Sequence, residues 1–518
     1  MLSESRDALV PIDSLPPEIL SRIFLLLRNA FLKYTSSFKV FLDWLPIVQV
    51  SQHWRQVALD CADLWSELPC NKNLLPLFLA RSRTCPVSLS VMTSERNIPS
   101  IISALQSLPR IRRLQALMRL EAWNTIMSGL RLPALELTEL ALSCLSEGDP
   151  GIPIWPENFL GGNAPRLRRL ILGGVPFPGY LPVFHGLTHL HLVAPGRRTP
   201  LAILLGALRQ MPNLKSLTSR NTADQTVSEN DLDITNLTLP IIMPHLEELS
   251  ISSPWFASSL LLLNSLRLPK SPTLDFQIGF DELGTTISDS LPFLLQVLKR
   301  AYQNGMSPFV TLNLGATPYE FHLIALDTLG RTTCMIRLEN LDDEIDLQEH
   351  LSLWFQECGN LPLAHLESLE LCGPDSLYFF SQYDELPQLK SITADQDDGG
   401  DGLIEFLLQN FDWHCGETKG PMTWEEEEQE LLGLVQVDNC HEGQGWSNIA
   451  LPALKSVTFR SSIYDFRKHR YWVQTLMARK RHGYGPSKIV LERCIGLTAE
   501  RTRDLQAMVE VEWDGLVC

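Results

Sequence analysis

The stretch APRLRRLIL, residues 164–172, decides the fold of this chain. In an extended strand, residues two apart share a face, so Leu170 and Leu172 are expected to point into a core while Ile171 points away from it. Leu167 adds a further apolar side chain just before the strand. A strand this short is stable only when other strands lie beside it. The stretch therefore predicts one strand of a larger sheet.

The same phrase recurs along most of the chain, as in LPRIRRLQA (108–116), MPHLEELSI (243–251) and LPALKSVTF (451–459). Up to residue 251 the phrases stand roughly 20 to 32 residues apart, which is near the ~20 to 29 residue period of leucine-rich repeats. Helix-like stretches such as PLAILLGALRQM (200–211) lie between them. Strand, loop and helix thus alternate, and we expect parallel strands on an inner face with helices outside.

This pattern resembles leucine-rich repeats loosely, because no asparagine closes the phrase at the equivalent positions. The chain is therefore expected to form an irregular leucine-rich-repeat-like solenoid. Its register between residues 253 and 362 stays open, with SPTLDFQI, SPFVTLNL and CMIRLENL as the expected strands. The alternative is a non-repeat α/β fold with leucine-rich strands. Contacts to a target protein would come from the strand residues that point away from the core: Gln115, Ala141, Ile171, His191, Thr218, Ser250, Glu370, Thr393 and Thr458.

The N-terminal region carries a different pattern, that of short amphipathic helices. In IDSLPPEILSRIFLLL (12–27), two prolines mark a helix start and the apolar residues recur at helical spacing. The segment WLPIVQVSQHWRQVALDCADLWSEL (44–68) predicts a further helix from about Ser51, so that three short helices result. Because so small a unit buries little of its own surface, a partner protein is expected to cover one apolar side.

These residues resemble the F-box family, whose pattern is an LPxEIL opening, an I-F pair, a V-S-x-x-W-R element and a closing L-W. The segment NLLPLFLARSRTCPVSLSV (73–91) is also similar to the helix and strand that follow the F-box in many fungal members. The resemblance implies that the helices bind a Skp-type adaptor, which links the chain to a cullin-based ubiquitin ligase. The implied adaptor-binding residues are Leu15, Pro16, Ile19, Leu20, Ile23, Leu27, Val50 and Trp54.

The predicted organisation is a tail (1–11), an F-box helical domain (12–70) and an irregular leucine-rich-repeat-like domain (71–518) with an acidic loop insertion around 395–448. The stretch Arg28–Asp43 is longer than the usual family linker. The alternative for the N-terminal region is an ordinary three-helix cap on a repeat array. Toward the end, a basic helix is expected from about Ser462 to His482. The last stretch, TAERTRDLQAMVEVEW (498–513), is expected to be a capped helix.

Composition narrows the class of partner. The net charge of −17 argues against binding to a phosphate backbone. No apolar run reaches the ~18 residues that span a bilayer, and the start lacks a signal sequence, so we expect an intracellular protein, cytoplasmic or nuclear, that does not bind membranes. The 11 cysteines include no CxxC pair and are expected to be reduced thiols.

The sequence offers no familiar catalytic signature, since GxxxxGK[ST], GxSxG, HExxH and GxGxxG are all missing. His414, Cys415, Cys440 and His441 lack the usual zinc spacing. We therefore assign no catalytic, cofactor-binding or metal residue and expect no cofactor. The expected function is a non-catalytic substrate receptor of a Skp-cullin-F-box type ubiquitin ligase. The alternatives are an interaction scaffold without a ubiquitin role, and an unrecognised hydrolase or transferase with polar residues converging in a pocket.

Overall fold

The computed structural model divides into two compact units, unit 1 (Met1–Thr285) and unit 2 (Thr286–Cys518). It describes residues 15–33, 43–69, 71–145, 153–193, 199–221, 240–253, 256–269, 272–279, 308–317, 320–339, 363–372, 386–395, 403, 407, 451–464, 466–481 and 483–516. Each unit combines mostly parallel strands with helices, so the chain is an α/β protein. Apart from Leu403 and Leu407, the acidic insertion beyond Asp395 lies outside the described residues, as do His414, Cys415, Cys440 and His441. The helix-like stretches SLPFLLQVLKRAYQ (290–303) and LQEHLSLWFQE (347–357) lie outside them as well.

Unit 1 begins with short helices, as the sequence predicts. They are α2 (Pro17–Lys33), the 3-10 helix η2 (Leu45–Gln49), α3 (Gln52–Asp60) and the 3-10 helix η3 (Ala62–Trp65). The predicted start near Ser51 is confirmed, because the Ser51 side chain accepts a hydrogen bond from the Trp54 backbone N–H and caps α3. Helix α2 continues to Lys33, further than the predicted end at Leu27, since residues 28–33 contain no helix-breaking residue.

An aromatic cluster joins these helices to the elements that follow, β1 (Glu67–Leu68) and α4 (Leu75–Arg81). The Trp65 ring lies 5.0 Å from Phe78 and 5.3 Å from Trp44, measured between centroids. Its indole N–H donates to the Ala58 carbonyl at 2.8 Å. Strand β1 pairs with the next strand, β2. Contacts therefore continue across residue 70, and the division into compact units comes between Thr285 and Thr286.

The strands of unit 1 run parallel and in sequence order, each paired to the next. They are β2 (Val87–Met92), β3 (Ile111–Arg119), β4 (Glu139–Leu145), β5 (Arg169–Gly173), β6 (His189–Val193), β7 (Ser216–Arg220), β9 (Glu248–Ser253) and β11 (Thr273–Gly279). One leucine from each strand lies in the same register row, from Leu89 to Leu274, and every one is buried. This row confirms the alternation predicted from APRLRRLIL.

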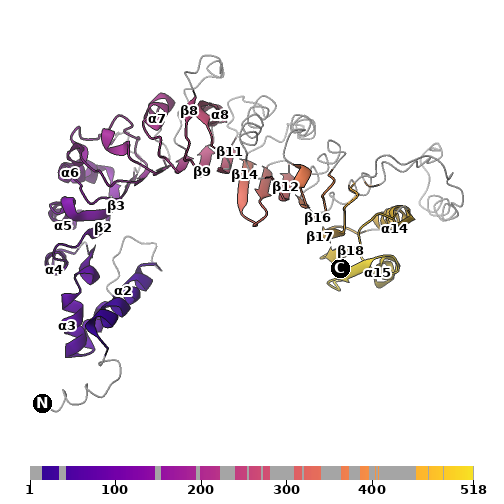
Figure 1. Cartoon of the computed structure of the whole chain (residues 1–518), viewed down its shortest axis with the longest axis horizontal. Coiled ribbons are helices and arrows are strands. Elements are labelled where there is room, and N and C mark those ends of the chain that lie inside the picture. Colours follow the sequence, from indigo (N-terminus) through magenta and orange to yellow (C-terminus); the bar gives the residue numbers. More distant parts are fainter. Residues whose placement is uncertain are drawn as a thin grey trace, which may run out of the picture. The chain divides into compact units, whose positions relative to one another are not determined.

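The buried side of these strands is covered by helices and turns. Helices α5 (Ile98–Leu105), α6 (Leu120–Gly129) and α7 (Leu201–Leu208) lie on one side of the strands (Figure 1). The other connecting elements are η4 (Leu108–Arg110), η5 (Phe159–Gly162), η6 (Pro182–Phe184), α8 (Phe256–Ser265) and the short pair β8 (Ile241–Ile242) and β10 (Leu266–Arg267). The opposite side of the strands carries the half-buried residues of each strand.

The turn after β5 depends on Gly174, and replacing it by alanine is expected to destabilise unit 1 by about 2–4 kcal/mol. Gly174 has φ +67°, and a Cβ atom there would lie 2.3 Å from the Cys144 carbonyl oxygen, which belongs to a paired strand and has no room to move. Gly206→Ala is the matched control. Gly206 lies exposed in α7 with nothing within 4 Å of an added Cβ, so alanine should stabilise by about 0.5–1 kcal/mol. Urea unfolding of both variants checks the pair.

Unit 2 departs from the predicted all-parallel order at its start. Strands β12 (Thr311–Thr317), β13 (Glu320–Leu326) and β14 (Thr332–Glu339) are joined antiparallel. Strands β12 and β14 were predicted from SPFVTLNL and CMIRLENL, but β13 was not. A tight turn makes the β13–β14 hairpin, because the Asp327 carboxylate accepts from the Leu329 and Arg331 backbone N–H groups and Gly330 has φ +71°. At Gly315 the missing side chain leaves room for the His322 ring of β13.

The remaining strands of unit 2 are parallel and follow β12 in sequence order. They are β15 (Ser368–Cys372), preceded by η9 (Leu363–His365), β16 (Ser391–Asp395), β17 (Ser456–Arg460), β18 (Lys488–Glu492) and β19 (Glu510–Trp513). The predicted basic helix is present as α14 (Phe466–Arg481). The last predicted helix is wrong in its second half: α15 (Ala499–Gln506) is capped by Thr498, but the alternating EVEW that follows forms β19.

Candidate partner-binding surfaces

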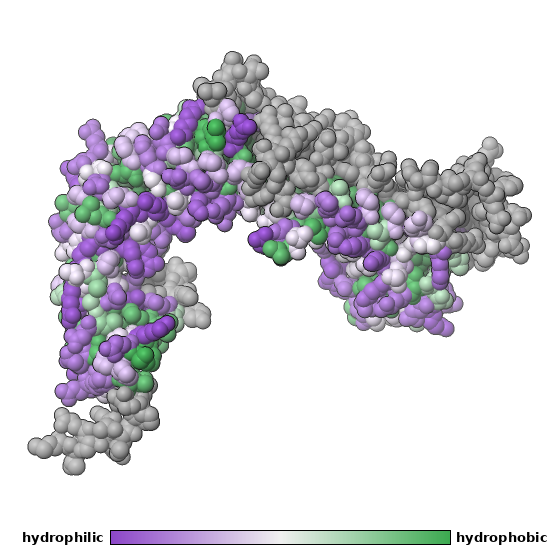
Figure 2. All heavy atoms as spheres, viewed as in Figure 1, coloured by the Kyte–Doolittle hydropathy of each residue, from purple (hydrophilic) through white to green (hydrophobic). Residues whose placement is uncertain are grey.

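Helix α2 keeps an apolar face exposed after its other side has packed. Leu20 and Phe24 are fully buried. On the adjoining face, Ile19 is 46% exposed, Ile23 38% and Leu26 64%. Spacings of three and four residues place these side chains on one face of a helix. Figure 2 shows hydrophobic side chains gathered over α2. We call Ile19, Ile23, Leu26 and Leu27 the α2 face.

The adaptor-binding residues implied by the family resemblance divide between this surface and the core. Pro16, Ile19, Ile23, Leu27 and Val50 are exposed, and Leu15 and Trp54 are half-buried. Leu20 has no exposed surface, so its side chain belongs to the core of the helical region and we leave it out of the candidate surface. The Trp54 ring packs 5.1 Å from Phe24.

Leu26 is a member of the α2 face that the sequence analysis missed. Its signal was its position three residues after Ile23, which continues the stripe of Ile19 and Ile23. The continuous run LLL at 25–27 hid that spacing, because a run without polar residues does not show which side of the helix is covered.

The second candidate surface is the strand side that faces away from the core. All nine residues predicted for target contacts are half-buried there. In unit 1, register pairs align Gln115, Ala141, Ile171, His191, Thr218 and Ser250 in one row, and in unit 2 they align Glu370, Thr393 and Thr458. The rows also include Ser90, Asp275, Asn313 and Val490, which the same alternation in the neighbouring strands would have given.

The strand side of unit 2 is held by one arginine. Arg460 lies 2.9 Å from a Glu370 oxygen, 3.0 Å from Glu492 and 3.6 Å from Asp395. Its hydrogen bonds to Glu492 and then to Glu370 raise the pKa of its guanidinium, although burial acts in the opposite direction. Four strands, β15 to β18, are thus joined by one guanidinium and three carboxylates.

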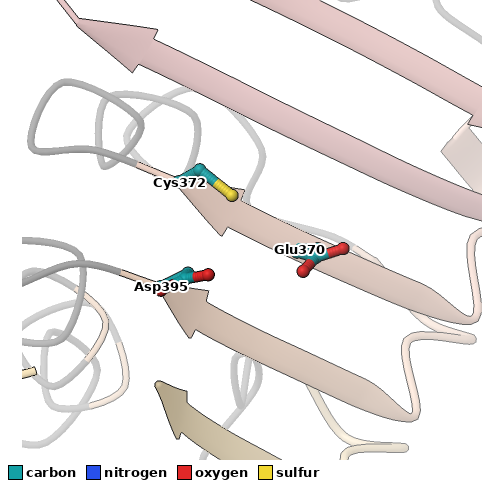
Figure 3. Close-up of side chains that lie close together, drawn as sticks. All are labelled: Glu370, Cys372 and Asp395. Carbon is teal, nitrogen blue, oxygen red and sulfur yellow. The ribbon is translucent and has the colours of Figure 1, made fainter. Parts of the chain in front are cut away.

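Cys372 completes a group of possible metal ligands with Glu370 and Asp395, whose ligand atoms lie within 4.8 Å of one another (Figure 3). Two observations argue against a metal there. Burial, followed by the charges of Glu370 and Asp395, raises the pKa of the Cys372 thiol to about 11, so it stays protonated at neutral pH. Both carboxylates are already paired with Arg460. The group is therefore best described as an ion-pair network.

No protein-family model matches the chain, and no curated protein matches it. Among the described residues, no helix is long and apolar enough to cross a membrane. A functional interpretation therefore rests on the α2 face, the strand sides and the family pattern at the N-terminus.

An open pocket of about 670 Å³ lies in unit 2 between the end of α14 and the start of β19. Two polar side chains of its lining donate hydrogen bonds to backbone carbonyls. The Lys480 ammonium donates to the Met508 carbonyl at 3.1 Å, and the Ser487 hydroxyl donates to the Lys455 carbonyl at 3.1 Å. The pocket therefore does not present Ser487 as a nucleophile poised beside a base, and it lends no support to the hydrolase alternative.

Proposed function

We propose that this chain is a non-catalytic substrate receptor, the F-box subunit of a Skp-cullin-F-box type ubiquitin ligase. In this proposal the N-terminal helices bind a Skp-type adaptor and the strand side binds a target protein, which brings target lysines close to the ligase. The ligase itself supplies the chemistry. The observation that carries the proposal is the exposed α2 face, within a segment that matches the F-box pattern in order.

The physical support comes from what the α2 face is made of. When a partner removes aliphatic residues such as Ile19, Ile23 and Leu26 from water, binding is favoured by roughly 25 cal/mol per Å² of buried apolar surface. A helix with such anchors on one side suits a groove in another protein. The buried Leu20 and Phe24, on the adjoining face, pack the helix against the rest of the helical region. The face is thus presented by a packed support, which lowers the entropy lost on binding.

The proposal also includes the finer architecture, an N-terminal three-helix F-box followed by an irregular leucine-rich-repeat-like solenoid. Its support is the repeated inner row, from Leu89 to Leu274 in unit 1 and from Leu312 to Ile489 in unit 2, in which each strand contributes one buried aliphatic residue. Such stacking leaves the other strand side open along each unit, where a target can bind without disturbing the core.

The test is direct binding between the purified full-length chain and a purified Skp-type adaptor, measured by calorimetry and by size-exclusion chromatography. We expect a one-to-one complex with a Kd on the order of a micromolar or tighter, since an apolar helix face is buried. Recovery of a cullin with the chain from cells would extend the result to the ligase. If no complex forms at concentrations well above this Kd, the adaptor role fails and the scaffold alternative stands.

A further inference from the structure

Two arginines and two histidines come together on the strand side of unit 1. Arg169 of β5 is paired in register with His189 of β6, and Val193 of β6 is paired with Arg220 of β7. His191 lies between them, two residues from each of its strand neighbours His189 and Val193. Because alternate strand residues share a face, all four basic side chains point to the same side. We call Arg169, His189, His191 and Arg220 the basic cluster.

Within the part of the chain that the structure describes, the two arginines of this cluster form no ion pair with a carboxylate. Among the described residues, no ion pair includes Arg169 or Arg220, and both side chains are exposed. Arg460, on the corresponding side of unit 2, is instead shared by three carboxylates. Glu139 of β4 is the register neighbour of Arg169 but forms no ion pair with it. In a chain with a net charge of −17, two exposed arginines that form no ion pair among the described residues are available for carboxylates from elsewhere.

His191 lies midway between the arginines, and aliphatic side chains lie beside it. Ile171 and Val193 are half-buried there, and Ala141 continues the row toward β4. Gly173 adds no side chain to this surface, and a Cβ there would lie 2.7 Å from the Ser143 hydroxyl. Small and aliphatic side chains between two cations suit a partner that carries an aliphatic residue between two anions.

We propose that the basic cluster binds an acidic, extended segment of a target protein, with carboxylates at Arg169 and Arg220 and an aliphatic side chain over Ile171. This deepens the target-binding half of the proposed function and rests on it. The spacing sets the segment: Arg220 lies four residues along the strands (~13 Å) and two strands across (~10 Å) from Arg169, which places the two positions ~16 Å apart on a diagonal. In an extended peptide, glutamates four residues apart span ~13 Å and share a face with the residue between them, and the long arginine side chains can cover the remaining ~3 Å.

The histidines make the binding depend on pH. Burial, then the charge of Arg169, lowers the pKa of His189, and burial, then Arg220, lowers that of His191. Both rings are therefore mostly neutral at pH 7. A bound carboxylate favours the protonated ring and raises its pKa, so binding takes up protons and strengthens as the pH falls from about 7.5 to about 5.5, where glutamate stays ionised. The charged groups that face these rings are Arg169, Arg220, Lys215, Glu247 and Glu248.

The experiment uses the full chain and a fluorescein-labelled peptide containing Glu-Ser-Leu-Ser-Glu, with the Gln-Ser-Leu-Ser-Gln peptide as its control, followed by fluorescence anisotropy at low salt. We expect the chain to prefer the glutamate peptide, and Arg169→Gln with Arg220→Gln to weaken binding about a hundredfold, or roughly tenfold for each arginine. Arg83→Gln with Arg503→Gln removes the same charge from exposed residues that are not part of the cluster and should leave binding unchanged.

Equal binding of the two peptides, or an unchanged affinity in the Arg169 and Arg220 variant, overturns the inference. So does a single-stranded RNA that displaces the glutamate peptide and loses its own affinity in the same variant, since the cluster would then serve phosphates of nucleic acid. Adaptor binding is measured on the same proteins. If the peptide binds but the adaptor does not, the proposed ligase function is wrong and the peptide-binding role of the cluster stands. If the adaptor binds but the peptide does not, only the role given to the cluster is wrong.

Discussion

Replacing Ile19 and Ile23 by aspartate in one chain is expected to weaken adaptor binding at least about a hundredfold while leaving thermal unfolding unchanged. The two side chains are 46% and 38% exposed, so carboxylates at these positions stay hydrated in the free protein. In an apolar groove they would lose that hydration without gaining partners, which costs several kcal/mol. Calorimetric titration with the adaptor and a thermal melt of the variant check both halves of the prediction.

Ile203→Asp is the matched control for this variant. Ile203 is 43% exposed and lies on a helix, α7, that is not part of the α2 face. The same substitution there should leave the adaptor affinity at the wild-type value. If Ile19→Asp with Ile23→Asp binds as tightly as Ile203→Asp, the α2 face is not the contact surface and the proposal loses the observation on which it depends.

Trp65→Ala is expected to lower the free energy of unfolding of unit 1 by about 3–5 kcal/mol. Trp65 is fully buried, with Trp44 and Phe78 against its ring and the Arg81 guanidinium 4.2 Å from its centroid. Alanine would leave a cavity among these groups and would also leave the Ala58 carbonyl without its indole donor. Guanidinium unfolding followed by tryptophan fluorescence and by circular dichroism gives the change.

Trp65→Phe separates packing from hydrogen bonding at the same position. Phenylalanine keeps most of the ring contacts but has no N–H, so a smaller loss of about 1–2 kcal/mol is expected. Adaptor binding should follow stability in this pair: it is lost in Trp65→Ala where the helices unfold and retained in Trp65→Phe. A Trp65→Ala protein that unfolds at the wild-type denaturant concentration would contradict the role given to the cluster.

The strands were predictable because residues that point into the core are apolar and recur at every second position. Leu114, Leu140 and Leu170 were placed on the core side from a spacing of two, and each is buried in its paired register. The outward residues followed from the same spacing. Helix starts were predictable where a side chain caps them, as at Ser51 and Thr498. These signals act between residues close in sequence, which is why one sequence sufficed to find them.

The rest depends on contacts between distant residues. Strand β13 was missed because its partner β12 contains Gly315, and the room this glycine leaves for His322 is visible only once the hairpin is formed. The sequence analysis assigned Leu20 and Ile19 alike to the adaptor surface, since both fit the helical stripe, and only packing against the rest of the helical region buries one of them. The pairing of Arg460 with Glu370 and Glu492 likewise joins strands far apart in the sequence.

If the chain acts as proposed, the packing around Trp65 and Phe78 affects the geometry of ubiquitin transfer. The helical region is joined to β2 by packing and strand pairing, not by a flexible linker. An adaptor bound to α2 would therefore hold a fixed orientation relative to the strands of unit 1. A fixed orientation determines which lysines of a bound target protein come within reach of the ligase. Inserting a few glycines between residues 69 and 75 should make this orientation variable. Ubiquitin would then be attached to more of the target's lysines, even if the adaptor and the target still bind.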